Sequence, residues 1–280
     1  FATKKAKDLV RMAVSKVTLM NPLKETELEV NQTAMVIGGG ISGMAAAKSL
    51  ANQGYETHII ERSDQLGGQA LNLYKTVTGE DIQEKLTGLI KEVQTNKNIH
   101  IHLDTAISNV DGFVGNFETT LSSNGQEENL EHGVAIVATG ASALKPAEYN
   151  YGKDPRILTS LELDRKFMDK DPALKKISTA VFIQCVGSRE PDRPYCSRVC
   201  CTHSIDNALQ LKKLNPAMSV FVLYRDIRTY GEREYIYKEA REAGVIFIRF
   251  SFEDKPQVTL KEGQLLVNAT DHILGRPVEI

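Results

Sequence analysis

The chain of 280 residues lacks tryptophan, and aromatic residues make up only 6% of it. It also lacks an excess charge of one sign, since 34 Lys and Arg stand against 36 Asp and Glu; this balance predicts no basic patch and no nucleic-acid partner. No apolar run approaches the ~18 residues of a membrane helix, so we expect no direct membrane insertion. With 41% hydrophobic and 25% charged residues, the composition is typical of a globular protein, for which we expect a cytoplasmic location.

Cysteine is scarce as well, and four residues in 280 do not make a secreted disulfide scaffold. Nothing at the start of the chain resembles a signal peptide, and Phe1 is not an initiator residue. Residues 277–280 resemble the beginning of a further strand, so we expect the chain to be a piece of a longer protein. Residues 2–20 carry apolar side chains at helical spacing, which predicts an amphipathic helix packed at a domain edge.

Strand and helix patterns alternate in two series along the chain, which predicts an α/β fold with two Rossmann-like, doubly wound units in tandem. We expect an N-terminal helix and linker over 1–30, a first unit with a β-meander over 31–145, and a second unit over 146–280 that stops before it returns to the first. The expected strands are 33–37, 55–60, 99–103, a meander within 105–137, 134–137, 179–183, 219–224, 245–250 and a hairpin over 257–270. The expected helices are 42–53, one near 79–95, 197–214 and 232–243.

A glycine loop lies between the first strand and the first helix of the first unit. Its pattern is Gly38-x-Gly40-x-x-Gly43, and Glu61 ends the following strand. In a dinucleotide-binding unit the first glycine permits the tight turn, the second lets the pyrophosphate approach the backbone, and the third lets helix and strand pack closely. The pattern therefore predicts a dinucleotide on the helix N-terminus with its ribose hydroxyls on Glu61, and it leaves the choice between FAD and NAD open.

Two further segments favour FAD. The run Glu61-Arg62-x-x-x-Leu66-Gly67-Gly68 resembles the extension found in two-dinucleotide-binding-domain flavoproteins, and Ala138-Thr139-Gly140 after a late strand is similar to a segment of the same proteins. The cofactor-binding residues that we expect are Gly38, Gly40, Ile41, Ser42, Gly43, Glu61, Arg62, Gly67, Gly68, Gln69, Ala138, Thr139 and Gly140.

All four cysteines lie between residues 185 and 201, as Cys185, Cys196, Cys200 and Cys201. Four clustered thiolates suit a [4Fe–4S] cluster or zinc. Neither two C-x2-C zinc knuckles nor the ferredoxin spacing is present, and a vicinal disulfide would be strained. The pattern favours a [4Fe–4S] cluster, with zinc (aided by His203) and redox-active or free thiols as alternatives.

The position of these cysteines carries further information. Cys185 follows the strand 179–183, where a pyridine-nucleotide domain has its phosphate-binding glycines, and only Gly187 remains there. We therefore expect a cofactor in place of NAD(P)H, although Asp226 after the next strand keeps a nicotinamide site as an alternative. Five arginines could add positive charge near the cluster: Arg189, Arg193, Arg198, Arg225 and Arg228.

The six histidines show no metal-binding spacing; His100 and His102 are expected on the same face of a strand, at a surface or in a satisfied core site.

Three segments resemble the A subunit of heterodisulfide reductase, and are similar to that of the quinone-interacting membrane-bound oxidoreductase: Gln184-Cys185-Val186-Gly187-Ser188-Arg189-Glu190, Tyr195-Cys196-Ser197-Arg198-Val199-Cys200-Cys201, and 223–231. The resemblance implies a thioredoxin-reductase-like flavoprotein core that binds FAD, with a [4Fe–4S] cluster on the four cysteines. It also implies a FAD-dependent oxidoreductase that passes electrons between flavin, cluster and other redox subunits. A homodimer is a further expectation.

This chain departs from that family in lacking the ferredoxin-type cysteine motifs that members usually carry outside the core. Two alternatives stay open: a conventional NAD(P)H-dependent FAD disulfide reductase, and a non-catalytic module with a structural zinc site. No catalytic residue is assigned.

Overall fold

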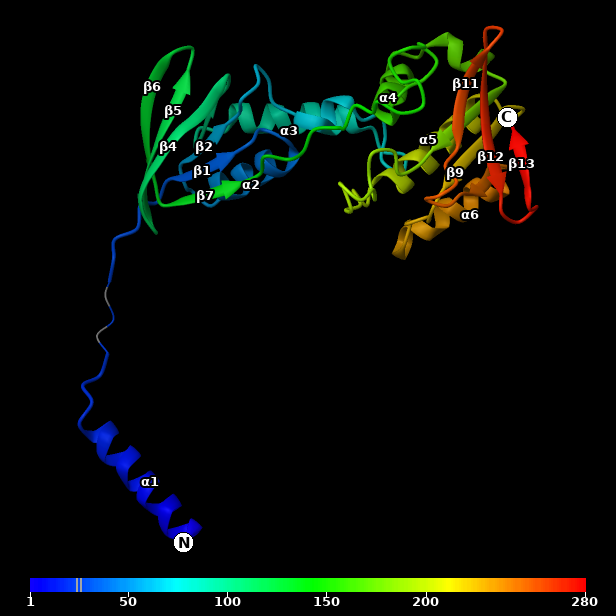
Figure 1. Ribbon diagram of the computed structural model, residues 1–280. Coiled ribbons are helices and arrows are strands. Elements are labelled where there is room, and N and C mark those ends of the chain that lie inside the picture. The colour runs from blue at the N-terminus through cyan, green and yellow to red at the C-terminus, as the bar shows by residue number, and fades with distance from the viewer. Residues whose placement is uncertain (24, 26) are drawn as a thin grey trace.

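The computed structural model describes residues 1–23, 25 and 27–280, which form an N-terminal helix and two α/β units (Figure 1). Helix α1 (Ala2–Thr18) has its apolar side chains at the expected spacing, but none of its residues is buried. The expectation that it packs at a domain edge is therefore wrong for the described part of the chain. Figure 1 shows α1 standing away from both units. None of the helices described is both long and apolar enough to cross a membrane.

The first unit is built on a parallel sheet with the strand order β3-β2-β1-β7. Buried side chains on one face of this sheet, such as Val36 and Ile59, pack against Leu86 and Val93 of the helical layer. On the other face, Met35 and Ile60 pack against Leu121 of an antiparallel meander. The elements are β1 (Ala34–Ile37), α2 (Ile41–Asn52), β2 (Thr57–Ile60), η1 (Gly68–Asn72), α3 (Ile82–Thr95), β3 (Ile99–His102), β4 (Thr105–Phe113), β5 (Asn116–Ser123), β6 (Gln126–His132) and β7 (Val134–Val137).

The second unit has a parallel sheet of order β10-β9-β8 and an antiparallel sheet of order β11-β12-β13. Its main core lies between the parallel sheet and helices α4, α5 and α6, and a second cluster joins the two sheets. The elements are α4 (Ser160–Met168), η2 (Pro172–Lys176), β8 (Thr179–Ile183), α5 (Cys200–Leu214), β9 (Ser219–Tyr224), η3 (Gly231–Arg233), α6 (Glu234–Glu242), β10 (Ile246–Arg249), β11 (Gln257–Lys261), β12 (Gln264–Asp271) and β13 (Arg276–Glu279).

The two units also contact each other through side chains. Tyr74, which lies between η1 and α3, stacks on Phe167 of α4 with ring centroids 5.4 Å apart, and Val77 also packs against the second unit's core. The backbone N–H of Tyr74 donates to Oδ2 of Asp164 at 3.0 Å, while Oδ1 of Asp164 lies 3.0 Å from Nε2 of His203. Asp164 is only 2% exposed, so it joins three segments inside the molecule.

The predicted fold class is confirmed by these parallel sheets and by the structural neighbours reported below. Strands β8 and β9 have the predicted bounds, whereas α5 begins at Cys200 instead of residue 197. Helix α4 was not predicted at all. Residues 138–159 form no helix or strand, and the predicted limit between 145 and 146, which stays a prediction, lies among them.

Candidate functional site

The turn from β1 into α2 requires glycine at two places. Gly38 has φ of 109°, in the region that favours glycine, and a Cβ there would overlap the carbonyl oxygen of Ala138. A Cβ at Gly43 would overlap the carbonyl oxygen of Gly38. These two residues therefore let the loop close and let α2 pack onto the sheet, as predicted for the first and third glycines of the pattern.

Gly40 has a different role, because no atom lies within 4 Å of the position that its Cβ would take. It is the N-cap of α2 and provides no side-chain cap, and the next two residues, Ile41 and Ser42, are exposed. The first N–H groups of a helix have no partner within the helix, and together with the helix dipole they favour an anion. The open cradle thus fits the pyrophosphate of a dinucleotide.

Glu61 follows β2 and is held against this loop. Its Oε2 accepts from the N–H of Gly39 at 2.7 Å, and its Oε1 accepts from the N–H and the hydroxyl of Ser63 at 2.9 and 2.8 Å. Burial alone would raise the pKa of the Glu61 carboxyl, but the hydrogen bonds from Ser63 and Gly39 outweigh it and lower the pKa. Glu61 is therefore an ionised carboxylate that orders the loop, and its remaining lone pairs can accept from ribose hydroxyls.

The other residues expected to bind FAD gather at the same edge of the sheet. Gly67 forms a bridge with Gly40, and its N–H donates to the carbonyl oxygen of Gly39 at 2.9 Å. The side-chain amide of Gln69 donates to the carbonyl oxygen of Ala141 at 3.1 Å, which ties η1 to the segment that follows β7. The structure also places Arg62, Gly68, Ala138, Thr139 and Gly140 in these segments; Arg62 and Thr139 are exposed.

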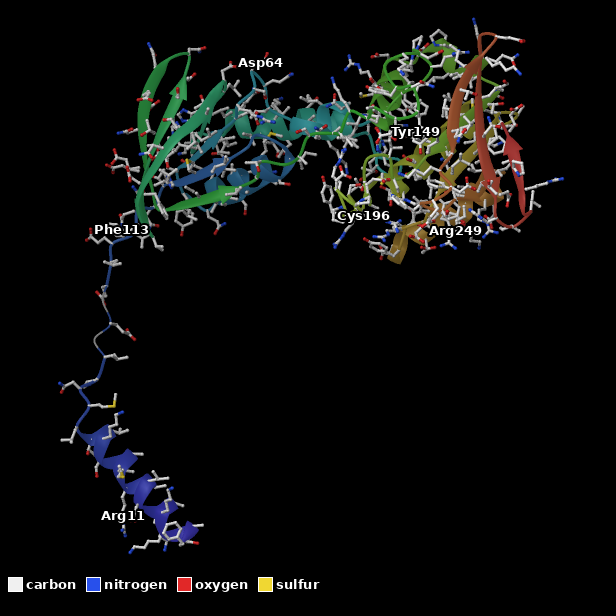
Figure 2. All side chains as sticks on the ribbon, viewed as in Figure 1. Arg11, Asp64, Phe113, Tyr149, Cys196 and Arg249 are labelled. Carbon is white, nitrogen blue, oxygen red and sulfur yellow. The ribbon has the colours of Figure 1, made fainter. Side chains whose placement is uncertain are left out.

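The four cysteines lie in the β8–α5 connection and in the first turn of α5. Cys185 has φ of 61°, and Arg189 and Arg198 have φ of 59° and 65°. For residues other than glycine this conformation costs roughly 1–2 kcal/mol each, so the connection is held in a strained shape by its surroundings. Figure 2 shows Cys196 on the side of the second unit that is turned toward the first in this view.

Each cysteine sulfur has its own polar neighbour. Nη1 of Arg189 lies 3.9 Å from the sulfur of Cys185, and the N–H of Arg198 donates to that of Cys196 at 3.4 Å. The Ser197 hydroxyl donates to Cys200 at 3.4 Å, and the buried Cys201 thiol donates to the carbonyl oxygen of Asp226 at 3.6 Å.

Cys200 and Cys201 are adjacent, and each affects the acidity of the other. The neighbouring Cys201 thiol lowers the pKa of Cys200 against the effect of burial, and the Ser197 hydroxyl adds to this effect. The neighbouring Cys200, together with burial, raises the pKa of Cys201. The surroundings of Cys200 therefore stabilise its thiolate, the form that binds metals.

The four sulfurs are a donor set that suits either a [4Fe–4S] cluster or a structural zinc ion. Within the described residues, no three cysteine sulfurs lie within 4.8 Å of one another. The chemistry of the donor set therefore fits both groups.

Arg225 and Asp226 support the connection from β9. The buried guanidinium of Arg225 donates to the carbonyl oxygens of Ser188 and Arg189 at 2.6 and 3.0 Å. Asp226 pairs with Arg189 at 2.6 Å and with Arg249 at 3.6 Å. The Asp226 carboxylate, 43% exposed, thus lies between two arginines, and two of the expected arginines hold the loop. Sequence reasoning did not identify these contacts.

Two buried polar atoms beside Cys185 have no partner among the described residues: Nε2 of Gln184 and Nε of Arg225. They belong to the lining of a small pocket of about 30 Å³, which also includes Tyr149 and Cys185. Burial raises the pKa of the Tyr149 hydroxyl, which therefore stays neutral.

The model of one protein family, pyridine nucleotide-disulphide oxidoreductase, matches residues 32–177. This match spans more than half of the chain, so the chain belongs to that family. The expected enzyme class, a FAD-dependent oxidoreductase, is thereby confirmed at the level of the family.

Curated relatives are similar over nearly the whole chain. The chain is 29% identical to the A subunit of the H(2):CoB-CoM heterodisulfide,ferredoxin reductase of Methanothermobacter marburgensis, over 99% of this chain and 56% of that protein. It is 28% identical to the first iron-sulfur A subunit of the CoB–CoM heterodisulfide reductase of Methanopyrus kandleri, over 100% of this chain and 56% of that protein. The resemblance stated from the cysteine-rich segments is therefore confirmed.

The chain spans only about half the length of these relatives. The first alignment runs over 374 positions although the chain has 280 residues, so that relative carries internal segments without a counterpart here. Among solved structures, Lactococcus lactis thioredoxin reductase in its FR conformation matches with a TM-score of 0.57 and 17% identity, over 89% of this chain and 74% of that one. This likeness shows the thioredoxin-reductase-like fold.

Proposed function

We propose that the chain is the FAD- and iron–sulfur-binding core of an electron-transfer oxidoreductase subunit similar to the A subunit of heterodisulfide reductase. The β8–α5 connection carries this proposal. It occupies the place of the phosphate-binding loop in the second Rossmann-like unit, and together with the first turn of α5 it holds the four cysteines. The Methanopyrus relative is named an iron-sulfur subunit, which supports the same assignment.

FAD is the dinucleotide that fits the first unit. Gly38 and Gly43 keep the loop closed, Gly40 leaves space in front of the α2 N-terminus, and Glu61 provides an ionised acceptor. Gly67 and Gly68 lie against Gly40, so the backbone of this segment borders the same space in front of the helix.

Cys185, Cys196, Cys200 and Cys201 would hold the cluster. FAD and an iron–sulfur cluster together supply the change between two-electron and one-electron transfer. The chain's own part is to bind and position both groups. Arg225 fixes the loop that carries Cys185, and Arg189 places a positive charge 3.9 Å from the sulfur of Cys185, where it stabilises an anionic ligand.

Redox subunits of a larger complex are the partners that we propose, because the curated relatives are named as the A subunits of such assemblies. The rival function, an NAD(P)H-dependent FAD disulfide reductase, is less well supported. It would require phosphate-binding glycines after β8, where only Gly187 is present.

The test is anaerobic purification followed by flavin, iron and sulfide assays on the original chain and on Cys200→Ser. We expect bound FAD and about four iron and four sulfide per chain, with the iron and sulfide lost in Cys200→Ser while FAD is retained. Retained FAD is the internal control for folding.

Bound flavin without iron, reduced rapidly by NADH, would refute the electron-relay proposal and support the rival reductase. One zinc per chain without iron or sulfide, lost in Cys200→Ser, would instead support the structural metal module on the cysteines.

A further inference from the structure

A cluster of three histidines and one glutamate lies on β2 and β3 and includes none of the residues assigned to the two sites described above. The two strands are parallel, and His58 stands opposite His100. Because side chains alternate along a strand, His102 lies on the same face as His100, and Glu56, two residues before His58, lies on that face too. The register thus gathers four side chains that no local spacing in the sequence reveals.

The side-chain atoms in this cluster are close enough to share one ion. Oε1 of Glu56 lies 3.1 Å from Nε2 of His100 and 3.6 Å from Nε2 of His58. One ligand atom from each of these three residues lies within 4.8 Å of the other two. A tetrahedral zinc ion with ligands at 2.0–2.1 Å needs ligand atoms about 3.3 Å apart, so small side-chain movements complete the geometry.

His102 supports this arrangement from the other side of His58. Its Nε2 lies 2.9 Å from Nδ1 of His58, and the two rings stack with centroids 5.2 Å apart. A histidine that binds a metal through one nitrogen is commonly oriented by a hydrogen bond at the other. His102 therefore leaves Nε2 of His58 directed toward Glu56 and His100.

The surroundings of His58 are more typical of a metal ligand than of a histidine exposed on the surface. The His58 side chain is 13% exposed, and it stacks on His100 with ring centroids 4.7 Å apart.

We propose that Glu56, His58 and His100 bind a divalent transition-metal ion of the zinc type, with His102 as a positioning residue. Two imidazoles and one carboxylate suit zinc and its neighbours in the Irving–Williams order, whereas Mg²⁺ and Ca²⁺ prefer oxygen ligands alone. Side-chain exposures of 56% for Glu56 and 47% for His100 leave a coordination position open to solvent. The ion would join β2 to β3, the edge strand of the sheet.

This site is separate from the proposed FAD site. Glu56 precedes β2, whereas Glu61 follows it, so the two lie at opposite ends of the same strand. Failure of one proposal therefore leaves the other untouched.

Calorimetric titration with ZnCl₂ tests the site in the original chain, His100→Gln and His272→Gln. His272 is an exposed histidine outside the cluster and provides the matched control. Zinc bound by the four cysteines is common to all three proteins, so it cancels in the comparison. We expect the original chain and His272→Gln to bind one more zinc ion than His100→Gln, and Glu56→Gln to bind that ion at least about tenfold more weakly.

Equal zinc uptake by His100→Gln and the original chain would overturn the proposal. A second measurement, NMR of the histidine ring protons during Co²⁺ addition, identifies the ligands directly. We expect early broadening of His58 and His100 and unchanged signals from His132 and His272; uniform broadening of all histidines would also overturn it. Unchanged melting of His100→Gln without metal confirms that this variant folds.

Discussion

At the scale of single residues, Gly40 shows that two kinds of glycine share one loop. Its backbone, with φ of −75° and ψ of −179°, is one that any residue adopts, and the space beside it is empty. Gly38 and Gly43 are required for the fold itself, whereas glycine at position 40 preserves a surface that a ligand can approach.

This difference makes Gly40→Ala a specific test of the cradle. We expect the variant to fold like the original chain but to bind FAD at least about tenfold more weakly, a loss of about 1.4 kcal/mol, because the added methyl group stands where the pyrophosphate approaches. Fluorescence titration with FAD measures the effect. Gly88→Ala in α3, where a Cβ also meets no atom within 4 Å, is the control and should bind FAD normally.

Glu61 predicts a dependence of stability on pH. Its folded-state pKa lies below the unfolded value of about 4.3, so its contribution is present above that value and is lost as the pH falls through the folded pKa. We expect Glu61→Gln to lower the free energy of unfolding by about 1–2 kcal/mol at pH 7, because an amide cannot accept at both positions.

Urea unfolding at pH 7 and at a series of pH values below 4 measures this effect. The two proteins should converge in stability as the carboxyl becomes protonated. The exposed Glu131→Gln should show little effect at any pH. A difference for Glu61→Gln that is constant with pH would contradict the ionised, hydrogen-bonded role of this carboxylate.

At the scale of elements, α4 is the piece that connects the two units. Asp164, on its buried side, accepts from Tyr74 and faces His203. We expect Asp164→Ala to reduce the free energy of unfolding by about 1–3 kcal/mol, since it leaves the Tyr74 N–H without its acceptor in a buried place. Denaturant unfolding measures the change.

Asp169→Ala at the end of the same helix is the matched control. Asp169 is exposed and pairs only with the exposed Arg165, so its removal should change stability by less than about 1 kcal/mol. A loss in this control as large as that of Asp164→Ala would mean that the helix itself, and not the buried contact, is responsible.

The elements differ in how far the sequence predicts them. The strands β8 and β9 are uniform apolar, β-branched runs, and their bounds were predicted correctly. Helix α4 has nine residues and a weak apolar pattern, and its start, a capping box of Thr159 and Glu162, was overlooked. Contacts such as Asp164–His203 join residues distant in the chain, and no local pattern contains them.

The same distinction applies to the sites. The glycine loop and the cysteines are local motifs, so their residues and positions after parallel strands could be predicted from the sequence. The Arg225 support and the engagement of Asp226 depend on side-chain directions across β8 and β9, and the His58–His100 pair depends on strand register. These features appear only when the strands are placed side by side.

At the scale of the whole molecule, the two proposed sites belong to different units. A series of contacts through η1, α4 and α5 connects them. The η1 segment begins at the Gly67–Gly68 cradle and continues into Tyr74, which packs on α4. His203 of α5, two residues after Cys201, lies against Asp164 of the same helix. The contact between Tyr74 and α4 thus helps to position the two units that carry the proposed FAD and cluster sites.

The contact between Tyr74 and Asp164 also affects what happens when the chain is cut between the two units. Residues 139–145 are exposed and form no helix or strand, which makes them the natural place to cut the chain. After a protease nick there, Tyr74 and Val77 of the first piece would still pack against the core of the second. The second piece produced alone would expose to water the apolar surface that Tyr74 and Val77 cover, and it would be prone to aggregate.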